Sequence, residues 1–334
     1  MVFNIPLFPD NASTLANQVD YLFYFLLLNF IFFCAVVFGA LIYFAIRYRR
    51  ERNPHAEQIH GSMLLEVTWT TIPFIIAMFM FAWGAVVFFY YSRPPANALE
   101  VYAVGKQWMW KIQHVEGQRE INQLHVPVNR DVRVIMTSQD VIHDFAVPAF
   151  RLKGDVVPGR YTSVWFHATK TGTYHLFCDQ YCGTLHSGMI GDVIVMEPAA
   201  YQNWLAVGGE GSMAQQGEHL FQQLGCNTCH RNDSEAHGPN LAGLYGNPVH
   251  LADGRTIAAD DAYLRESIVN PNAKIVYGFQ AIMPSFQGQI DEEGILQLIS
   301  YIKSMQSQQP GGPVKTSPNS PAVPGAAQPG YRVQ

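Results

Sequence analysis

Two thiols, an imidazole and a thioether fall within twelve consecutive residues of this chain, Cys178-Asp179-Gln180-Tyr181-Cys182-Gly183-Thr184-Leu185-His186-Ser187-Gly188-Met189. Thiolate and thioether sulfurs are soft ligands that suit copper and disfavour calcium or magnesium. The gap between the cysteines is wider than the two-residue knuckle of many zinc sites. A loop of this size allows both sulfurs to bridge a pair of metal ions, so we predict a copper centre here. A four-ligand zinc site and a Cys178–Cys182 disulfide are the alternatives.

A further ligand is expected from elsewhere in the same domain. The best candidate is His143, which lies beside an apolar strand end, 35 residues before Cys178. Short segments with alternating and β-branched residues surround it, separated by turn signals. They are Leu99–Val104, Asp131–Thr137, Tyr161–His167 and Asp192–Met196. We therefore predict a small antiparallel, all-β sandwich over residues 93–200, whose strands return His143 and the cysteines to one edge.

Two long apolar runs precede this region. Residues 21–46 contain Asn29 as their only strongly polar member, and residues 70–91 contain no charge. At a rise of 1.5 Å per residue the shorter run reaches about 33 Å, enough for a hydrocarbon core of roughly 30 Å. We predict a two-helix transmembrane hairpin over residues 21–92, preceded by an outer segment, residues 1–20.

The basic residues give the hairpin a direction. The first 46 residues contain no Lys or Arg, whereas the loop after the first span begins with Arg47, Arg49, Arg50 and Arg52. The positive-inside rule makes this loop cytoplasmic. We expect a bacterial plasma membrane location, with both termini and the metal-binding domains on the outer, periplasmic side.

A second cysteine pair lies nearer the C-terminus, in Cys226-Asn227-Thr228-Cys229-His230. This pentad is typical of covalent c-type haem attachment, in which the two thiols bind the haem and the imidazole becomes an iron ligand. Downstream, Gly238-Pro239-Asn240-Leu241 is similar to a loop whose proline carbonyl accepts the free N–H of that histidine. Met283 follows the pentad at a suitable distance to be the second axial ligand, and a His/Met pair raises the reduction potential.

Helical periodicity surrounds the pentad and then ceases. It covers Met213–Leu224, Asp260–Ile268 and Asp291–Met305, which predicts an all-α cytochrome c domain over residues 205–306. Residues 307–334 are rich in Pro, Gly and Ser, so we expect a disordered tail. His114, His125, His167 and His175 are interpreted as polar strand-face residues, and His219, His237 and His250 as solvent-facing.

Charge restricts the possible partners. The net charge of −5 and the absence of long basic runs give no indication of nucleic-acid binding. Residues 201–306 hold five basic and eleven acidic side chains, so the predicted haem domain is acidic. An acidic outer domain favours a basic electron donor by electrostatic steering.

The arrangement as a whole resembles subunit II of haem-copper oxidases, the cytochrome c oxidase family, in which a cupredoxin-like domain holds the binuclear copper centre called CuA. The resemblance runs from the hairpin to about residue 197. The family pattern is His in an Asp-Val-x-His stretch, then Cys-x-x-x-Cys-Gly-x-x-His-x-x-Met, matched by His143, Cys178, Cys182, His186 and Met189. The fused cytochrome c domain follows it.

The resemblance implies roles for further residues. Gln180 would offer its backbone carbonyl to copper, and Trp108 in Gly105-Lys106-Gln107-Trp108 would receive electrons. Glu66 would stand at the entrance of a proton pathway into the largest subunit. Many family members have Glu where Gln180 stands, and that carboxylate reaches a magnesium site. The neutral Gln180 leaves the magnesium site in doubt.

The resemblance implies a respiratory function. Electrons would pass from a periplasmic or membrane-bound donor to haem c, then to CuA, and then to catalytic subunit I, which reduces oxygen to water and pumps protons. This chain would supply no catalytic residue of the oxygen site and would contact other membrane subunits and lipid. The alternatives are a nitric oxide reductase with the same copper subunit, or a membrane-anchored copper-delivery protein.

Overall fold

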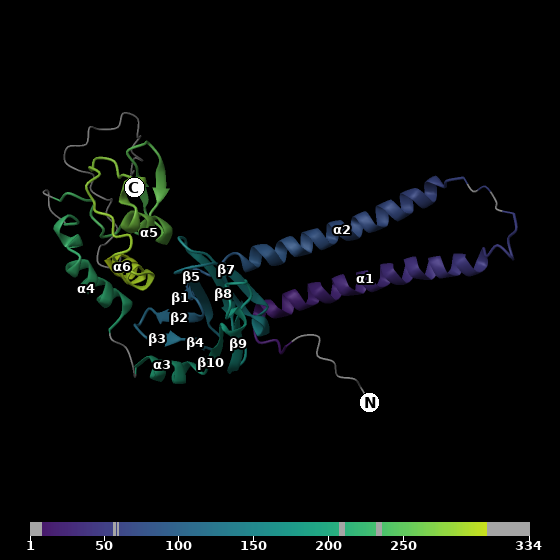
Figure 1. The fold of residues 1–334 in the computed structure, drawn as a ribbon, viewed down its shortest axis with the longest axis horizontal. Helices are drawn as coiled ribbons and strands as arrows, with labels where there is room; N and C mark the ends of the chain where they lie inside the picture. Colours follow the sequence, from purple (N-terminus) through teal and green to yellow (C-terminus); the bar gives the residue numbers. More distant parts are fainter. Residues whose placement is uncertain (1–8, 56–57, 59, 207–210, 232–235, 306–334) are drawn as a thin grey trace, which may run out of the picture.

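The structure is a computed structural model of the 334-residue chain, and it describes residues 9–55, 58, 60–206, 211–231 and 236–305. Three regions follow one another along the chain (Figure 1). A long helical hairpin projects from one side of a β-domain, and a group of shorter helices lies on the other side. The tail that we expect to be disordered, residues 307–334, lies outside the described residues.

The hairpin consists of α1 (Thr14–Arg47) and α2 (Met63–Tyr91). Both helices are long and apolar enough to cross a membrane. The residues in the most apolar stretch of each helix are almost all exposed. Both helices begin seven residues before the predicted apolar runs, because a helix can continue beyond the segment that spans the membrane. In α1 the cap is Ser13, whose Oγ accepts a hydrogen bond from the Ala16 amide at 3.1 Å.

The start of α1 also packs on the β-domain. Ser13 is fully buried and donates a hydrogen bond to the Phe150 carbonyl at 3.0 Å. Asp20 forms an ion pair with Arg151, with a distance of 2.8 Å from Oδ1 to Nε. These contacts fix the membrane hairpin to the domain that follows it.

The β-domain contains two five-stranded sheets, one with the order β3-β2-β1-β5-β8 and one with the order β4-β10-β9-β6-β7. The sandwich is confirmed, but it is not purely antiparallel, because β1 pairs with β5 and β10 with β4 in parallel. The predicted segments correspond to β1, β5, β8 and β10. The strands are β1 (Leu99–Lys106), β2 (Met109–His114), β3 (Arg119–Ile121), β4 (Gln123–Pro127), β5 (Asp131–Ser138), β6 (His143–Val147), β7 (Leu152–Val156), β8 (Thr162–His167), β9 (Gly172–Cys178) and β10 (Ile190–Met196).

The first sheet is buried on both faces. On β1, Val101 and Ala103 face the sandwich core, whereas Tyr102 and Val104 belong to a second apolar cluster on the outer face. Successive side chains of a strand point to opposite faces, so burial of both sets requires a cover on each side. The shorter helices supply the outer cover.

The helical region is confirmed in the three segments predicted as helices. Its first helix, α4, begins with a complete capping box in which Ser212 and Gln215 satisfy each other's backbone amides. Short 3-10 turns and a two-stranded sheet connect the helices. The elements are α4 (Met213–Gln223), η3 (Cys226–Thr228), β11 (Pro248–His250), β12 (Thr256–Ala258), α5 (Asp261–Val269), η4 (Pro271–Ala273) and α6 (Glu292–Ser304).

Helix α3 (Pro198–Ala206) is not among the helices predicted from the sequence. It covers His114 and changes the interpretation of that residue. His114 is not on an open strand face but fully buried beneath α3. Its Nδ1 lies 3.2 Å from the Tyr201 hydroxyl, and its Nε2 lies 2.8 Å from Glu120. The ring of Trp204 on α3 stacks on His125 at a centroid distance of 4.6 Å. This packing holds α3 against the β-domain.

Candidate metal centres

The ends of two strands bring the predicted copper ligands together. Strands β6 and β9 run antiparallel with Phe145 opposite Cys178, so His143 at the start of β6 lies beside the end of β9. The chain then makes a loop that includes a short 3-10 turn, η2 (His186–Gly188), and returns into β10. The Cys178 amide donates to the Met189 carbonyl at 3.1 Å, which closes this loop at its base.

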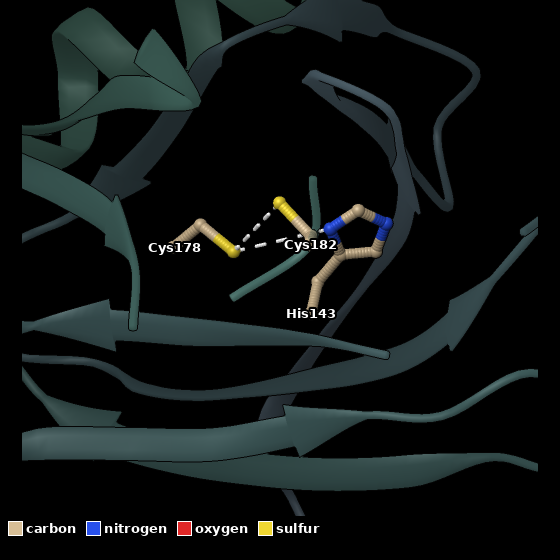
Figure 2. Close-up of side chains that lie close together, drawn as sticks. All are labelled: His143, Cys178 and Cys182. Carbon is tan, nitrogen blue, oxygen red and sulfur yellow. Dashed lines mark hydrogen bonds between the residues drawn. The ribbon is translucent and has the colours of Figure 1, made fainter. Parts of the chain in front are cut away.

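All six predicted ligands converge at this edge, and Figure 2 shows His143 and the two cysteines pointing toward one another. The Sγ atoms of Cys178 and Cys182 lie 3.7 Å apart. The other separations are 3.9 Å from Cys178 Sγ to His143 Nδ1, 3.3 Å from Cys178 Sγ to Gln180 O, 3.6 Å from Cys182 Sγ to His186 Nδ1 and 3.9 Å from Cys182 Sγ to Met189 Sδ.

The chemistry of this cluster fits a pair of copper ions. Both cysteines are free, and their sulfurs are much farther apart than the roughly 2.05 Å of a disulfide bond. Two sulfurs that lie side by side can bridge two ions, and the imidazole near each sulfur can be a terminal ligand to one of them. A structural zinc ion takes four ligands and has no use for the thioether of Met189. The donor set therefore fits soft copper better than zinc.

Ionisation of the cysteines agrees with metal binding. Burial alone would raise the pKa of Cys178, but hydrogen bonding to His143 and to backbone groups outweighs burial and lowers this pKa to about 7. Burial and the neighbouring Cys178 sulfur raise the pKa of Cys182 to about 12. The pair therefore loses one proton readily and keeps the second until a cation replaces it.

Asp140 orients one of the ligands, a role that sequence reasoning missed. Its Oδ1 accepts a hydrogen bond from His143 Nε2 at 2.8 Å, which leaves Nδ1 facing Cys178. Asp140 is itself held by backbone amides of Gln107 and Val141, at 2.8 and 2.7 Å. Although burial opposes the effect, these donors and His143 lower the pKa of Asp140. A carboxylate behind a ligand histidine fixes its tautomer and ring orientation.

Trp108 lies against the copper loop. The side-chain amide of Gln107 donates to the Cys182 carbonyl at 2.7 Å and ties the β1–β2 turn to the loop. Gly183 has a φ of +120°, and a Cβ atom there would approach the Trp108 ring to 3.3 Å. Glycine therefore allows the loop to turn and the half-buried tryptophan to lie next to the residue that follows Cys182.

The pentad that is predicted to attach haem, residues 226–230, follows α4 closely. Cys226, Cys229, His230 and Met283 all line one cavity of about 340 Å³. The remaining walls are mainly apolar and come from α4, α5 and α6, with Phe221, Leu264, Ile268, Leu298 and Ile302 among them. A large apolar cavity with two thiols, an imidazole and a thioether on its walls fits a covalently attached haem.

His230 is fixed in the tautomer that an iron ligand needs. His230 Nδ1 lies 2.8 Å from the Pro239 carbonyl. A carbonyl oxygen only accepts hydrogen bonds, so Nδ1 carries the proton and Nε2 has a free lone pair. Burial lowers the pKa of His230, which keeps the ring neutral. A Cβ atom at Gly238 would come within 2.8 Å of this ring, so only glycine leaves room for it.

Glu66 belongs to neither site. It lies in the first turn of α2, at the end of the helix opposite to the one that leads into β1, and its side chain is exposed. His219, His237 and His250 are exposed, as predicted, although His237 also lines the rim of the haem cavity.

Three families of known proteins match successive parts of the chain. Residues 2–84 match "Cytochrome C oxidase subunit II, transmembrane domain", and residues 118–197 match "Cytochrome C oxidase subunit II, periplasmic domain". Residues 212–302 match "Cytochrome C oxidase, cbb3-type, subunit III". The chain is thus a membrane protein with a transmembrane hairpin, a periplasmic domain and a C-terminal cytochrome c domain.

Individual relatives agree. Cytochrome c oxidase subunit 2 of Thermostichus vulcanus is 30% identical over 59% of this chain and 77% of its own length. The subunit 2 of Alkalihalophilus pseudofirmus is 28% identical over 81% of this chain and 82% of its own. The crystal structure of the periplasmic domain of subunit II from Bradyrhizobium japonicum is 34% identical, covering 34% of this chain and 95% of that one, with a TM-score of 0.33. The match to the Thermostichus vulcanus subunit and the three family matches show that the chain belongs to the cytochrome c oxidase subunit II family, as a member with a fused cytochrome c domain.

Proposed function

We propose that this subunit, which transfers electrons to a haem-copper cytochrome c oxidase, does so through a haem c and a binuclear copper centre used in series. The observation that carries the proposal is the cluster of His143, Cys178 and Cys182, whose ligand atoms lie within 4.8 Å of one another. When bound, the two groups would supply reversible one-electron chemistry, the haem facing the donor and the copper pair facing the catalytic subunit.

In the β-domain, Cys178 and Cys182 would bridge the two copper ions. His143 and His186 lie near one sulfur each, and Met189 and the Gln180 carbonyl would complete the set. These ligands are attached to strand ends and hydrogen-bonded loops, so they keep their positions when the charge of the site changes. Rigid ligands lower the reorganisation that accompanies each electron transfer, which favours a fast relay.

In the helical domain, Cys226 and Cys229 would hold the haem covalently, with His230 and Met283 as axial ligands. The hydrogen bond from His230 to Pro239 orients the imidazole. The apolar cavity walls would keep water from the haem, and the His/Met pair would raise its reduction potential. The acidic surplus of residues 201–306 supports a basic periplasmic or membrane-bound donor.

The oxygen chemistry belongs to catalytic subunit I. Neither α1 nor α2 contains a histidine, so these spans offer no imidazole to a haem or copper inside the membrane. Their exposed apolar side chains would contact subunit I, other membrane subunits and lipid. Subunit I would reduce oxygen to water and pump protons, with Trp108 receiving electrons near the copper loop.

A rapid-mixing experiment tests the order of the two groups. Oxidised enzyme is mixed with a reduced donor, and the haem c band and the near-infrared copper band are followed. We expect the haem band to change first and the copper band to follow. Met189→Leu should perturb the copper band while leaving the haem phase intact. A copper band that changes before the haem band would contradict the proposal.

The role of Glu66 as the entrance of a proton pathway is tested separately. Glu66→Ala in the assembled oxidase should slow turnover while both metal spectra stay unchanged, because Glu66 lies in the first turn of α2 and contacts neither site. The ratio of oxygen consumption between variant and parent enzyme measures the effect. Normal turnover would remove Glu66 from the pathway.

A further inference from the structure

The helical domain, which carries the haem cavity, rests on the outer face of the sheet that contains β1 and β5. An apolar patch forms the centre of this interface, with Tyr102, Val104 and Ile135 on the sheet and Met213 and Leu296 on the helices. At its margin the Met213 amide donates to the Val115 carbonyl at 3.0 Å. The two domains therefore share both apolar and backbone contacts.

Lys303, near the end of α6, lies beside this patch between groups of both domains. Its Nζ is 3.3 Å from Glu100 Oε2 and 3.2 Å from the Tyr102 hydroxyl, both on β1. In its own domain, Nζ is 2.9 Å from Asp261 Oδ1 and 4.8 Å from the centre of the Tyr245 ring. Only 17% of the Lys303 side chain is exposed, and despite this burial its acidic and phenolic neighbours raise its pKa.

The other ionic contacts between the domains are simpler. Lys111 on β2 pairs with Glu293 on α6 at 2.6 Å, with about a quarter of each side chain exposed. Arg265 on α5 donates to the Gly159 carbonyl at 2.9 Å and also pairs with Glu292 of its own domain. Among the described residues, Lys303 is thus the cation that faces a carboxylate of each domain.

The same helix connects this interface to the haem cavity. On α6, Leu296 and Lys303 face the sheet, whereas Leu298 and Ile302 line the cavity. A shift of α6 on the sheet would therefore move the wall of the haem cavity relative to the copper ligands. The rate of electron tunnelling depends on the distance between the two groups, so the position of α6 matters for the relay.

We propose that Lys303 is a positioning residue that locks the haem-binding domain onto strand β1 and so fixes the haem cavity relative to the copper site. Its effect on electron transfer rests on the proposed function, whereas the lock itself does not. Without the Lys303 charge, Glu100 would keep, among the described residues, only the contact of its Oε1 with Arg133 Nη1, at 3.4 Å within its own domain. Glu100 and Asp261 would then face each other across the interface with no cation between them. The repulsion between these two carboxylates would favour separation of the two domains.

Hydrogen–deuterium exchange on the assembled oxidase tests the lock directly. The Met213 amide, which bonds across the interface, reports domain separation even when the separated state is rare. We expect Lys303→Met to raise its exchange rate by about 30-fold, the effect of truncating one partner of a buried charge pair. The Leu264 amide, bonded to Asp260 within the haem domain, should keep its rate.

Matched variants separate the lock from general destabilisation. Lys274→Met also removes a lysine that pairs with a carboxylate, but Glu266 belongs to the same domain, so the Met213 amide should be unaffected. Adding Glu100→Gln to Lys303→Met should restore much of the protection by removing the repulsion. An unchanged Met213 rate in Lys303→Met, equal acceleration at Leu264, or no rescue by Glu100→Gln would overturn the proposal.

The consequence for the relay is read from the same variants. Lys303→Met should slow the copper phase in rapid mixing while the optical spectra of both groups stay as in the parent enzyme. Faster Met213 exchange with an unchanged copper phase would leave the lock standing and contradict its link to the rate of electron transfer, whereas the order of the two groups is tested by the parent enzyme alone. Unchanged Met213 exchange would overturn the lock whatever the kinetics.

Discussion

The copper site and the haem site differ in how much of each site the polypeptide forms without its metal group. In the copper site, the ligand atoms already lie within 3.3 to 3.9 Å of their neighbours and are oriented by backbone hydrogen bonds. The haem site is a cavity of about 340 Å³ whose walls come from segments between Phe221 and Ile302, a stretch of 82 residues. A small site can be preformed by strand ends, whereas the haem must act as part of its own domain's core.

The largest effect is expected from removing the haem attachment. Cys226→Ala combined with Cys229→Ala should unfold the helical domain, because keeping a cavity of this size empty costs about 8 kcal/mol at most, at about 24 cal/mol per Å³. That cost is comparable with the whole stability of a domain. Calorimetry should show loss of one unfolding transition.

Copper removal is the matched comparison. Chelation should leave the β-domain folded, because Cys178, Cys182 and Met189 are already packed in its core and the loop is closed by its own hydrogen bonds. If the β-domain also loses its transition after chelation, or the haem-free helical domain keeps its own, the contrast between a preformed and a cofactor-completed site is wrong.

A smaller effect is expected at Gly238, which lies against the ring of His230. Gly238→Ala would push a methyl group against the His230 ring and should destabilise the helical domain by about 1–3 kcal/mol, the usual cost of overpacking. The haem absorption spectrum should shift as the ring turns. Gly188→Ala in the copper loop is the control, because a Cβ there meets nothing within 4 Å. An unshifted spectrum in Gly238→Ala would count against the assigned role of His230.

Asp140→Asn tests whether the copper ligands are held in place before copper binds. This change removes the charge behind His143 and should weaken copper binding by about 10- to 100-fold, as measured by competition with a chelator. Asp131→Asn is the matched control, because Asp131 also pairs with a histidine, His167 at 2.8 Å, outside the metal site. Equal affinity in both variants would show that Asp140 does not orient the ligand.

The smallest effect is expected at Gln180. Its carbonyl faces Cys178, whereas its side chain is exposed. Gln180→Ala should therefore leave the copper absorption and paramagnetic-resonance spectra almost unchanged. A large spectral change would mean that the side chain, and not the carbonyl, belongs to the site.

The sequence was sufficient for features that depend on neighbours in the chain. The copper loop, the haem pentad and the two apolar spans are local patterns, and the structure brings the predicted ligands together at two sites. His143 could be added because a strand end and an antiparallel return bring it to the loop.

Features that depend on tertiary contacts could not be predicted. The roles of Asp140 and Gln107 follow from the β1–β2 turn meeting the copper loop. Helix α3 is nine residues long and is held by the stacking of Trp204 on His125. Strand β1 is buried on its outer face by a domain whose Lys303 lies 203 residues later in the chain than Glu100. No local pattern encodes such a pairing.

The metal content and paramagnetic-resonance spectrum of the purified oxidase test the central claim, that one chain holds a copper pair and a haem in separate pockets. Measured per chain of this subunit, and after subtracting the metals of subunit I, we expect two copper ions and one haem c iron. We also expect a mixed-valence copper signal that Cys182→Ser abolishes without changing the haem. Zinc, a single copper ion, or no metal between Cys178 and Cys182 would contradict the account.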